Sequence, residues 1–333
     1  MPATIVAIIP LYNGARFIRS SLESVLNQER QADEIIVVDD GSTDDGASIV
    51  ADIARTDPRI KLLSKSNGGQ GSARNFGVES SSSDLIAFLD QDDKWYPHHL
   101  RILEQPLLVK SGAPLGWVYS NLDQVNEDGR MICHSFLSTF TKIEHPKRTL
   151  KSCLAQDMYV LPGASLIARE AYTSVGGFDP QFVGYEDDDL FLRMFCAGWR
   201  GEYIDQPLTV WRVHPLSASY SSSMAVSRSR YFEKLKTSFP DEPEMNRYYV
   251  RDYISPRFVS NALADLYKAM LAQDRDRIAL ARSHIKSFSE NLAFPRKDLI
   301  RAFTFVATLP PSMWLVRSLP KSIFGQLRTR AKL

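Results

Sequence analysis

The sequence predicts an α/β protein built on a doubly wound, mostly parallel, Rossmann-like sheet, followed by a helical C-terminal extension. Short apolar runs of strand length alternate with stretches of helical spacing about every 25–30 residues, which implies right-handed crossovers between parallel strands. Each of these runs ends in a cluster of polar turn residues. In the last third the strand-like runs stop, and apolar residues recur at helical spacing.

Four predicted strands lie in the first third of the chain, and a turn follows each one. They are residues 4–9, 34–38, 60–63 and 85–89. Apolar residues at helical spacing separate them, as in the segment from Phe17 to Leu26, so each strand is expected to return through a packed helix.

The later elements are less regular. Residues 98–109 are predicted to form a helix, and residues 116–122 and 163–169 are predicted strands. A loop is expected at 175–179, and a helix is expected whose first turn holds the acids at 186–189 and which continues through residues 190–195. Residues 133–160 carry no readable pattern, and residues 230–284 predict two or more helices.

Polar segments follow the strands at the edge where ligands bind in doubly wound sheets. Asn13, Asp39, the glycine-rich loop 67–71 and residues 90–93 are therefore expected to line one crevice. The glycine-rich loop offers backbone amides and a helix N-terminus to a phosphate, and Arg74 adds positive charge. Asp39 is suited to a nucleotide base or ribose, although turn and N-cap chemistry is the simpler explanation for an isolated Asp-Gly-Ser site.

Three carboxylates, Asp90, Asp92 and Asp93, arrive within four residues after the fourth strand. Their repulsion needs compensation, and a hard cation such as Mg²⁺ or Mn²⁺ supplies it while also holding substrate phosphates. The alternative is a solvated acidic turn.

A second acidic cluster, residues 186–189, runs into the apolar segment 190–195 and is expected to lie in the first turn of a helix. Acids in a first helical turn complement the macrodipole, which explains Asp188 or Asp189 but not four acids in a row. Because crowded carboxylates raise one another's pKa, one of them is a candidate general base.

Charge is distributed unevenly along the 333 residues, although the net charge is only +1. Residues 1–215 carry 20 basic and 29 acidic side chains, and residues 216–333 carry 20 and 10. We expect a catalytic domain at 1–220 and a helical extension at 221–333 that meets an anionic surface. A membrane is favoured over nucleic acid because of the tail described below.

Cysteine usage and the first residues bear on location. Cys133, Cys153 and Cys196 share no metal-type spacing, so they are predicted to be packing residues in a reducing compartment. The start of the chain shows no signal-peptide pattern. A cytoplasmic location is expected, and it is compatible with peripheral attachment to the inner face of the plasma membrane.

Six short motifs follow one another along the chain: Pro10-Leu11-Tyr12-Asn13, Val38-Asp39-Asp40-Gly41-Ser42, Gly71-Ser72-Ala73-Arg74-Asn75, Leu89-Asp90-Gln91-Asp92-Asp93, Gly176-Gly177-Phe178-Asp179 and Glu186-Asp187. In this order they resemble the motifs of inverting family 2 glycosyltransferases, over roughly residues 4–220. Each motif is modest alone, but six in order are specific.

The resemblance implies a GT-A fold and metal-dependent, inverting transfer of a sugar from a nucleotide-diphosphate donor to a glycan or lipid-linked acceptor. It also implies a role in cell-surface polysaccharide, lipopolysaccharide or glycolipid assembly. Asp187 matches the family's catalytic base, Asp92 its metal ligand and His214 a later position near the metal or diphosphate, although a lone histidine is more often structural. The implied donor-binding residues are Pro10, Tyr12, Asn13, Asp39 near the base, Gly71, Arg74 and Asp90 near the ribose.

Departures from the family pattern also carry information. The Gln-x-x-Arg-Trp motif of processive synthases is missing, since Gln206 followed by Trp211-Arg212 has the wrong spacing and order, so non-processive transfer is expected. Four consecutive acids leave the base assignment open by one position, with Asp187 preferred.

Other classes fit the sequence less well. A phosphatase of the haloacid dehalogenase type places its acidic pair after the first strand, and a dinucleotide oxidoreductase needs a glycine-rich first loop that residues 10–14 lack. A sugar-phosphate nucleotidyltransferase or a non-catalytic nucleotide-sugar or glycan binding protein remains an alternative. The sequence does not specify the donor sugar, the base, the acceptor or the linkage.

The tail, residues 294–333, combines apolar and aromatic residues with eight Lys or Arg and the single acid Asp298. Prolines and arginines interrupt it, which argues against a spanning helix. It is predicted to lie in the interface of an anionic bilayer or, alternatively, to pack as helices on the catalytic domain.

Overall fold

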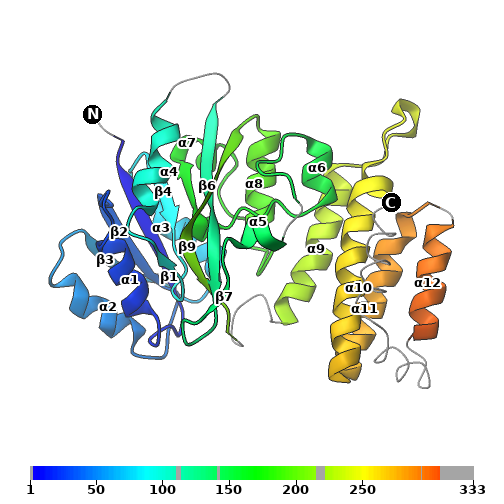
Figure 1. Ribbon diagram of the computed structural model, residues 1–333, viewed down its shortest axis with the longest axis horizontal. Coiled ribbons are helices and arrows are strands. Elements are labelled where there is room, and N and C mark those ends of the chain that lie inside the picture. Colours follow the sequence, from blue (N-terminus) through cyan, green and yellow to red (C-terminus); the bar gives the residue numbers. More distant parts are fainter. Residues whose placement is uncertain (1–2, 110–113, 141–142, 215–221, 294, 308–333) are drawn as a thin grey trace. The chain divides into compact units, whose positions relative to one another are not determined.

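The computed structural model describes residues 3–109, 114–140, 143–214, 222–293 and 295–307 (Figure 1). The chain divides into two compact units. One consists of residues up to 147 together with 158–227, and the other of residues 148–157 together with those from 228 onward. The expected boundary at residue 220 remains a prediction.

The first unit contains, within its described residues, a nine-stranded sheet in the order β3-β2-β1-β4-β8-β6-β9-β5, with β7 paired to β6. The strands are β1 (Ile5–Leu11), β2 (Glu34–Asp39), β3 (Ile60–Ser64), β4 (Leu85–Phe88), β5 (Lys94–Trp95), β6 (Leu115–Val125), β7 (Met131–Cys133), β8 (Ser165–Ala168) and β9 (Arg200–Arg212).

The four strands predicted in the first third are confirmed, and β3, β2, β1 and β4 run parallel. In register, Leu11 of β1 lies beside Asp39 of β2, and Asp39 beside Ser64 of β3. The loops that follow these strands therefore leave the sheet at one edge, which is the edge expected to bind ligand.

Beyond β4 the sheet is mixed. β8 runs antiparallel to β4 and β6, β5 runs antiparallel to β9, and β6 and β9 are parallel. The predicted strand at 163–169 is shorter than expected: a 3-10 turn (Pro162–Ala164) precedes β8, and α7 (Arg169–Ser174) follows it. Pro162 has no amide to donate to a ladder, which favours the turn.

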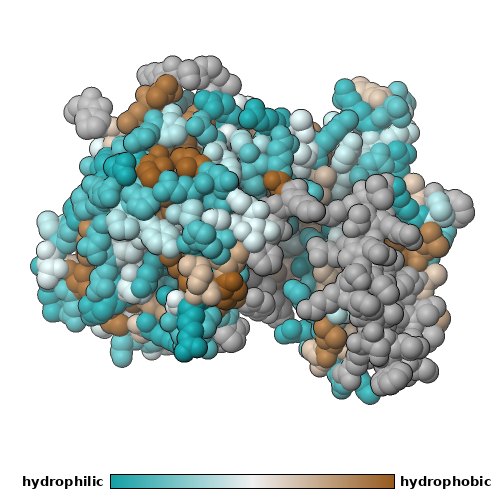
Figure 2. All heavy atoms as spheres, in the orientation of Figure 1, coloured by the Kyte–Doolittle hydropathy of each residue, from teal (hydrophilic) through white to brown (hydrophobic). Residues whose placement is uncertain are grey.

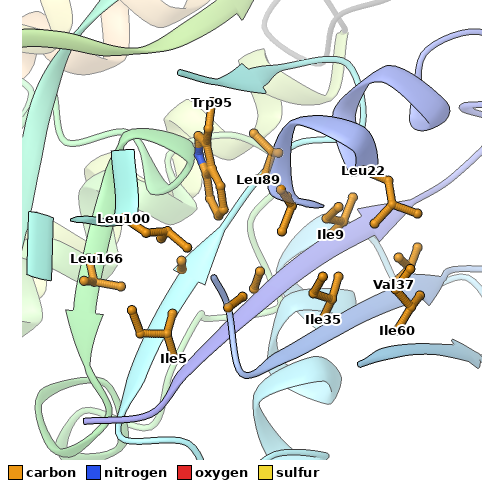
Figure 3. Packing of buried hydrophobic residues seen from close by; sticks show 14 of the residues in the cluster. Ile5, Ile9, Leu22, Ile35, Val37, Ile60, Leu89, Trp95, Leu100 and Leu166 are labelled. Carbon is orange, nitrogen blue, oxygen red and sulfur yellow. The ribbon is translucent and has the colours of Figure 1, made fainter. Parts of the chain in front are cut away.

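Helices cover both faces of the parallel half (Figure 1). They are α1 (Ile18–Leu26), α2 (Gly46–Ala54) and α3 (Gln70–Glu79), and the later helices of this unit include α4 (His99–Leu108), α5 (Phe136–Phe140) and α8 (Glu186–Cys196). Because side chains alternate along a strand, β1 presents Ile5, Ala7 and Ile9 to the α1 side. Figure 3 shows this core, in which Ile9, Ile35 and Val37 lie near Leu22 and the cluster continues to Trp95, Leu100 and Leu166.

The opposite face of β1 packs on α3. A Cβ at Gly77 would lie 2.6 Å from Cγ2 of Ile8, so this helix position needs glycine. The close approach of α3 to β1 brings the Arg74 side chain, which belongs to this helix, against the sheet.

The second unit is helical in its described residues, as predicted for 230–284. It contains α6 (Leu150–Ala155), most of α9 (Ser222–Ser238), a π-helical turn (Val250–Ile254), α10 (Ser255–Ala272), α11 (Arg275–Phe288) and α12 (Arg296–Ala307). Its centre is aromatic: the rings of Phe232, Phe258 and Phe288 lie with centroids 4.6–5.5 Å apart. Buried Arg257 of α10 donates to the Asp157 carboxylate and to the Cys153 carbonyl of α6 (3.4 Å).

The cysteines only partly follow the prediction that they are packing residues. Cys133 and Cys153 are buried, whereas Cys196 is exposed. Cys196 is the last residue of α8 and is exposed to solvent at the end of this helix, so the prediction that it is a packing residue is wrong.

On the face shown in Figure 2, hydrophilic residues cover most of the first unit, and apolar residues form small separate groups. None of the helices in the described segments has both the length and the apolarity that crossing a bilayer requires. Residues 308–333 of the predicted basic tail lie outside the described residues.

Candidate active site

The loops after β1 and β2 are joined by Asn13 and Asp39. The Asn13 side-chain oxygen accepts from the amide (2.8 Å) and hydroxyl (3.2 Å) of Thr43, and the Asn13 amide donates to Ser42 Oγ (3.1 Å). Asp39 Oδ1 accepts from the Ser42 amide at 3.0 Å, which is the turn chemistry that the sequence left open. Two residues expected to bind donor thus also fix the loops that follow β1 and β2.

The loop after β4 is fastened to β1 through Gln91. The Tyr12 amide donates to Gln91 Oε1 (2.8 Å), and Gln91 Nε2 donates to the Tyr12 carbonyl (3.0 Å). The Tyr12 ring is half exposed, whereas Pro10 is buried within β1 beside Val38. The motif analysis gave Gln91 no role, because an amide between carboxylates adds no charge that a pattern would reveal.

In the glycine-rich loop, two backbone amides that were expected to bind a phosphate donate instead to the carboxylate of Asp40. Asp40 accepts from the amides of Gly68 (3.0 Å) and Gly69 (2.8 Å), and Lys65 Nζ lies 2.7 Å from its Oδ1. The expectation that this loop cradles a phosphate is therefore wrong for those two amides. A Cβ at Gly71, in the first turn of α3, would lie 3.4 Å from Phe178 Cβ, so the helix packs closely there.

Arg74 is almost completely buried, with 2% of its side chain exposed. One terminal nitrogen donates to Asp90 Oδ1 at 2.6 Å, and Gln70 Nε2 donates to the same oxygen at 2.6 Å. The other terminal nitrogen lies 3.6 Å from a carboxylate oxygen of Glu186. Arg74 therefore joins the two acidic clusters.

Asp92 and His214 meet at the end of the site, with His214 Nε2 2.8 Å from Asp92 Oδ2. The His214 ring also contacts Phe17 at a centroid distance of 5.3 Å. Burial, reinforced by Asp90, raises the pKa of Asp92, and the contact with His214 opposes that rise. The two predicted metal ligands are brought together.

Asp93 has a different surrounding. It is buried, and its Oδ1 accepts the Arg212 amide at 2.8 Å. Burial and the neighbouring Asp92 and Asp90 carboxylates raise its pKa well above the ordinary value. This carboxyl group supports the loop from within the protein.

Arg212 acts as a clamp on the same loop. Its Nε donates to the Asp92 carbonyl (2.9 Å), and a terminal nitrogen donates to the carbonyls of Asn126 (3.2 Å) and Glu127 (3.0 Å). A planar guanidinium satisfies several carbonyls at once. The end of β9, the Asp92 loop and the β6–β7 turn are thereby held together.

The second acidic cluster forms the first turn of α8, and three of its four members have well-defined structural partners. Glu186 accepts from the Gly184 amide (2.6 Å), Asp188 accepts from the Met158 amide, and Asp189 accepts from Arg193 Nε (2.8 Å). Tyr185, just before the helix, adopts a left-handed conformation with φ of 68°.

Asp187 is the partly exposed member of the cluster. Its Oδ1 accepts the Asp188 amide at 2.8 Å. Burial, followed by the negative charges of Glu186 and Asp188, raises the pKa of Asp187 to about 8, while Arg74 opposes the rise. A carboxylate with a pKa near neutrality is suited to accept a proton.

A family model named "Glycosyl transferase family 2" matches residues 6–175, which is about half of the chain. The chain is also 29% identical over 257 residues to an uncharacterized glycosyltransferase of a Nostoc species, with 74% of each chain covered.

Solved structures share the fold. The chain matches Staphylococcus aureus TarS 1–349 in complex with UDP-GlcNAc, with a TM-score of 0.64, 16% identity, and coverage of 99% of this chain and 90% of that one. It also matches a Pyrobaculum calidifontis mannosyltransferase in complex with GDP-Man and Mn²⁺, with a TM-score of 0.51, 16% identity, and coverage of 100% and 87%. The mixed sheet with its flanking helices is the predicted GT-A fold. The chain therefore belongs to glycosyl transferase family 2 and is a glycosyltransferase.

Proposed function

We propose that the protein transfers one sugar at a time from a nucleotide-diphosphate donor to an acceptor hydroxyl, with a divalent cation and with inversion at the anomeric carbon. The observation that carries this proposal is the meeting of two acidic clusters through Arg74 at the carboxyl edge of the sheet. One cluster, together with His214, offers oxygen and nitrogen ligands, and the other offers a carboxylate of raised pKa. Structural relatives solved with UDP-GlcNAc and with GDP-Man and Mn²⁺ support the donor class.

Asp92 and His214 are the residues that would hold the cation. No group of three or more potential ligands is found among the described histidine, cysteine, aspartate and glutamate residues. The Asp92 carboxylate fits Mg²⁺ or Mn²⁺, hard cations that take carboxylate oxygens and can complete their shell with phosphate oxygens and water. When bound, such a cation offsets the charge of the departing diphosphate.

Donor binding is assigned to the edge formed by Pro10, Tyr12, Asn13, Asp39, Gly71 and Asp90. Asp39 is placed at the nucleoside because it ends β2 beside the Asn13 loop. The half-exposed Tyr12 ring lies on the same edge, where it can pack against the donor. Asp90 is partly exposed and is assigned to the ribose.

Asp187 is the proposed general base. Its carboxylate accepts the acceptor's hydroxyl proton while the acceptor oxygen forms its bond to the anomeric carbon and the bond to the diphosphate breaks. One displacement of this kind inverts the anomeric centre, whereas a covalent intermediate would retain it. Asp187 is partly exposed whereas its three neighbours are buried, which favours it over Asp188, whose oxygen accepts the Met158 amide.

The test compares Asp187→Asn with the wild type after a screen of nucleotide sugars has identified a donor. We expect turnover to fall about 10²- to 10⁴-fold while donor binding stays within a few-fold. Product from the wild type should have the opposite anomeric configuration to the donor, as measured by NMR. Normal turnover by Asp187→Asn, or a retained configuration, would contradict the assignment. Hydrolysis and binding of donor without any transfer would favour a binding protein.

The second unit is proposed to place the enzyme at an anionic membrane surface, where a lipid-linked acceptor would be found. In α12, Leu299 and Phe305 are 65% and 58% exposed. The same helix and its neighbours carry basic side chains, and residues 216–333 have an excess of positive charge. Exposed apolar residues beside basic ones are typical of interfacial helices.

A further inference from the structure

The structure assigns a positioning role to Arg74 and Glu186: we propose that this buried pair holds Asp187 in register with the Asp90–Asp92 loop. The inference rests on the proposed role of Asp187 as the base. It gives Arg74 a different task from binding the leaving group directly. It also gives a role to Glu186, a residue of the Glu186-Asp187 motif to which the sequence analysis assigned none.

Burial of Arg74 is the first argument. Only 2% of its side chain is exposed, and its guanidinium carbon lies over the rings of Phe88 (5.9 Å to the centroid) and Phe178 (5.1 Å), which also contact each other. A cation enclosed in this way is costly unless carboxylates compensate it. Asp90 at 2.6 Å and Glu186 at 3.6 Å supply that compensation, each at a different terminal nitrogen of the guanidinium.

The position of each partner in the chain is the second argument. Asp90 directly follows the end of the β4 strand and lies two residues before Asp92, whereas Glu186 is the first residue of α8 and directly precedes Asp187. A guanidinium that contacts both carboxylates therefore fixes the spacing between the proposed cation site and the proposed base. The hydrogen bond to Asp90 and the longer ion pair with Glu186 restrain the distance between the two carboxylates, and positioning of this kind matters for the rate of a reaction.

Hydrogen bonds at the start of α8 couple the position of Glu186 to that of Asp187. The second carboxylate oxygen of Glu186 accepts the Gly184 amide at 2.6 Å, and Gly184 and Tyr185 both have positive φ angles (96° and 68°). This turn sets the direction in which α8 begins. The rest of the first turn is held separately, by Asp188 at Met158 and by Asp189 at Arg193. Neutralising Glu186 is therefore expected to release the bridge without releasing the helix.

Electrostatics give the two partners opposite effects on the base. The charged groups around Asp187 are Glu186 and Asp188 of α8 and Arg74 of α3, with Asp90 behind Arg74. The Glu186 charge raises the pKa of Asp187, and the Arg74 charge lowers it. Removing the Glu186 charge should thus shift the pH dependence of activity to lower pH, and removing the Arg74 charge should shift it to higher pH.

The experiment measures kcat and kcat/KM against pH for wild type, Glu186→Gln, Arg74→Met and a matched control, Asp189→Asn, which loses an ion pair on the same helix outside the bridge. We expect the acidic limb of kcat/KM to move down by about one pH unit in Glu186→Gln and up in Arg74→Met. Both variants should lose about 10- to 100-fold in kcat through misplacement of the base. The limb of Asp189→Asn should coincide with that of the wild type.

Other outcomes separate the possibilities. If Arg74→Met raises only the donor KM and leaves the limb in place, Arg74 binds donor and the bridge is wrong. If Arg74→Met does not fold, Glu186→Gln decides alone, because an unchanged limb in that variant overturns the proposal. If Asp187→Asn remains active, the proposed base fails, and that result is independent of the Glu186→Gln comparison.

Discussion

Asp187, the proposed general base, is expected to lower the stability of the fold at neutral and higher pH. Its pKa is raised to about 8 in the folded protein, against an ordinary value of 3.8. The folded state therefore favours the protonated carboxyl group. Stability from this preference is fully present below pH 4 and is lost as pH rises through about 8.

A pH-dependent stability difference follows for Asp187→Asn, which cannot ionise. Without metal or donor, the variant should unfold at a higher temperature than the wild type. The difference should grow between pH 5 and pH 8 and then level off, with a free-energy gain on the order of a few kcal/mol. Calorimetry or dye-monitored melting at several pH values measures it. A difference that is constant across this range would show that Asp187 ionises normally.

The Asp92–His214 contact leads to a prediction about metal dependence. Chelation with EDTA should abolish transfer, and added Mn²⁺ or Mg²⁺ should restore it. Asp92→Ala should stay inactive at any metal concentration, whereas His214→Gln should recover activity at higher metal concentration because one ligand remains. Glu127→Gln, whose side chain pairs with Arg16 on the surface, is a control that should show the wild-type requirement. Full activity in EDTA would reject a metal-dependent reaction.

Helices and strands could be predicted from the sequence where interactions between residues close in the chain determine them. β1 to β4 were predictable because each is a short apolar run buried on both faces and ended by turn residues. The edge at which Asn13, Asp39 and Asp90 lie also follows from strand order alone.

The remaining features depend on partners distant in sequence. Asp40 takes the amides of Gly68 and Gly69, 28 and 29 residues away, and no pattern in the glycine-rich loop shows that. The Arg212 clamp spans 120 residues to the Asp92 carbonyl. The pairing of strands in the mixed half of the sheet could not be predicted either, because β6 and β9 pair with register shifts that the periodicity of the sequence does not reveal.

The loop before α8 allows a matched test of close packing. Gly176 and Gly177 both have positive φ (76° and 70°), but a Cβ at Gly177 would lie 2.8 Å from Asn75 Oδ1, whereas a Cβ at Gly176 would meet nothing within 4 Å. Gly176→Ala should cost about 1 kcal/mol from backbone strain alone. Gly177→Ala should cost about 2–4 kcal/mol because overpacking is added. Equal losses in denaturant unfolding would show that the Asn75 contact is unimportant.

At the scale of the whole molecule, the charge difference between the two parts of the chain suggests distinct tasks. The acidic part carries the proposed catalytic groups, and the basic part carries α12 with its exposed Leu299 and Phe305. Apolar residues insert into the interface of a bilayer, and basic residues strengthen attraction to anionic lipid.

Vesicle flotation tests this division of tasks. The full chain should float with vesicles that contain phosphatidylserine and should remain unbound with phosphatidylcholine alone. The double variant Leu299→Glu/Phe305→Glu should lose most of this binding. Met245→Glu, at another exposed apolar position, should keep it. A chain ending at Arg296 that floats as well as the full chain would reject α12 and the tail as the binding element.

The contact of Arg257 with Asp157 has a consequence for biosynthesis. The two residues are 100 positions apart, and α6, which carries buried Cys153 and Leu154, is completed long before its partner helix α10. At about 5–20 residues per second, α6 waits about 5–20 seconds on the ribosome before Arg257 is added. During that interval its apolar side is uncovered, and the second unit cannot close until α10 has been synthesised. A fragment that starts at residue 228 would lack α6 altogether, so we expect it to fold only when a peptide covering residues 148–157 is supplied.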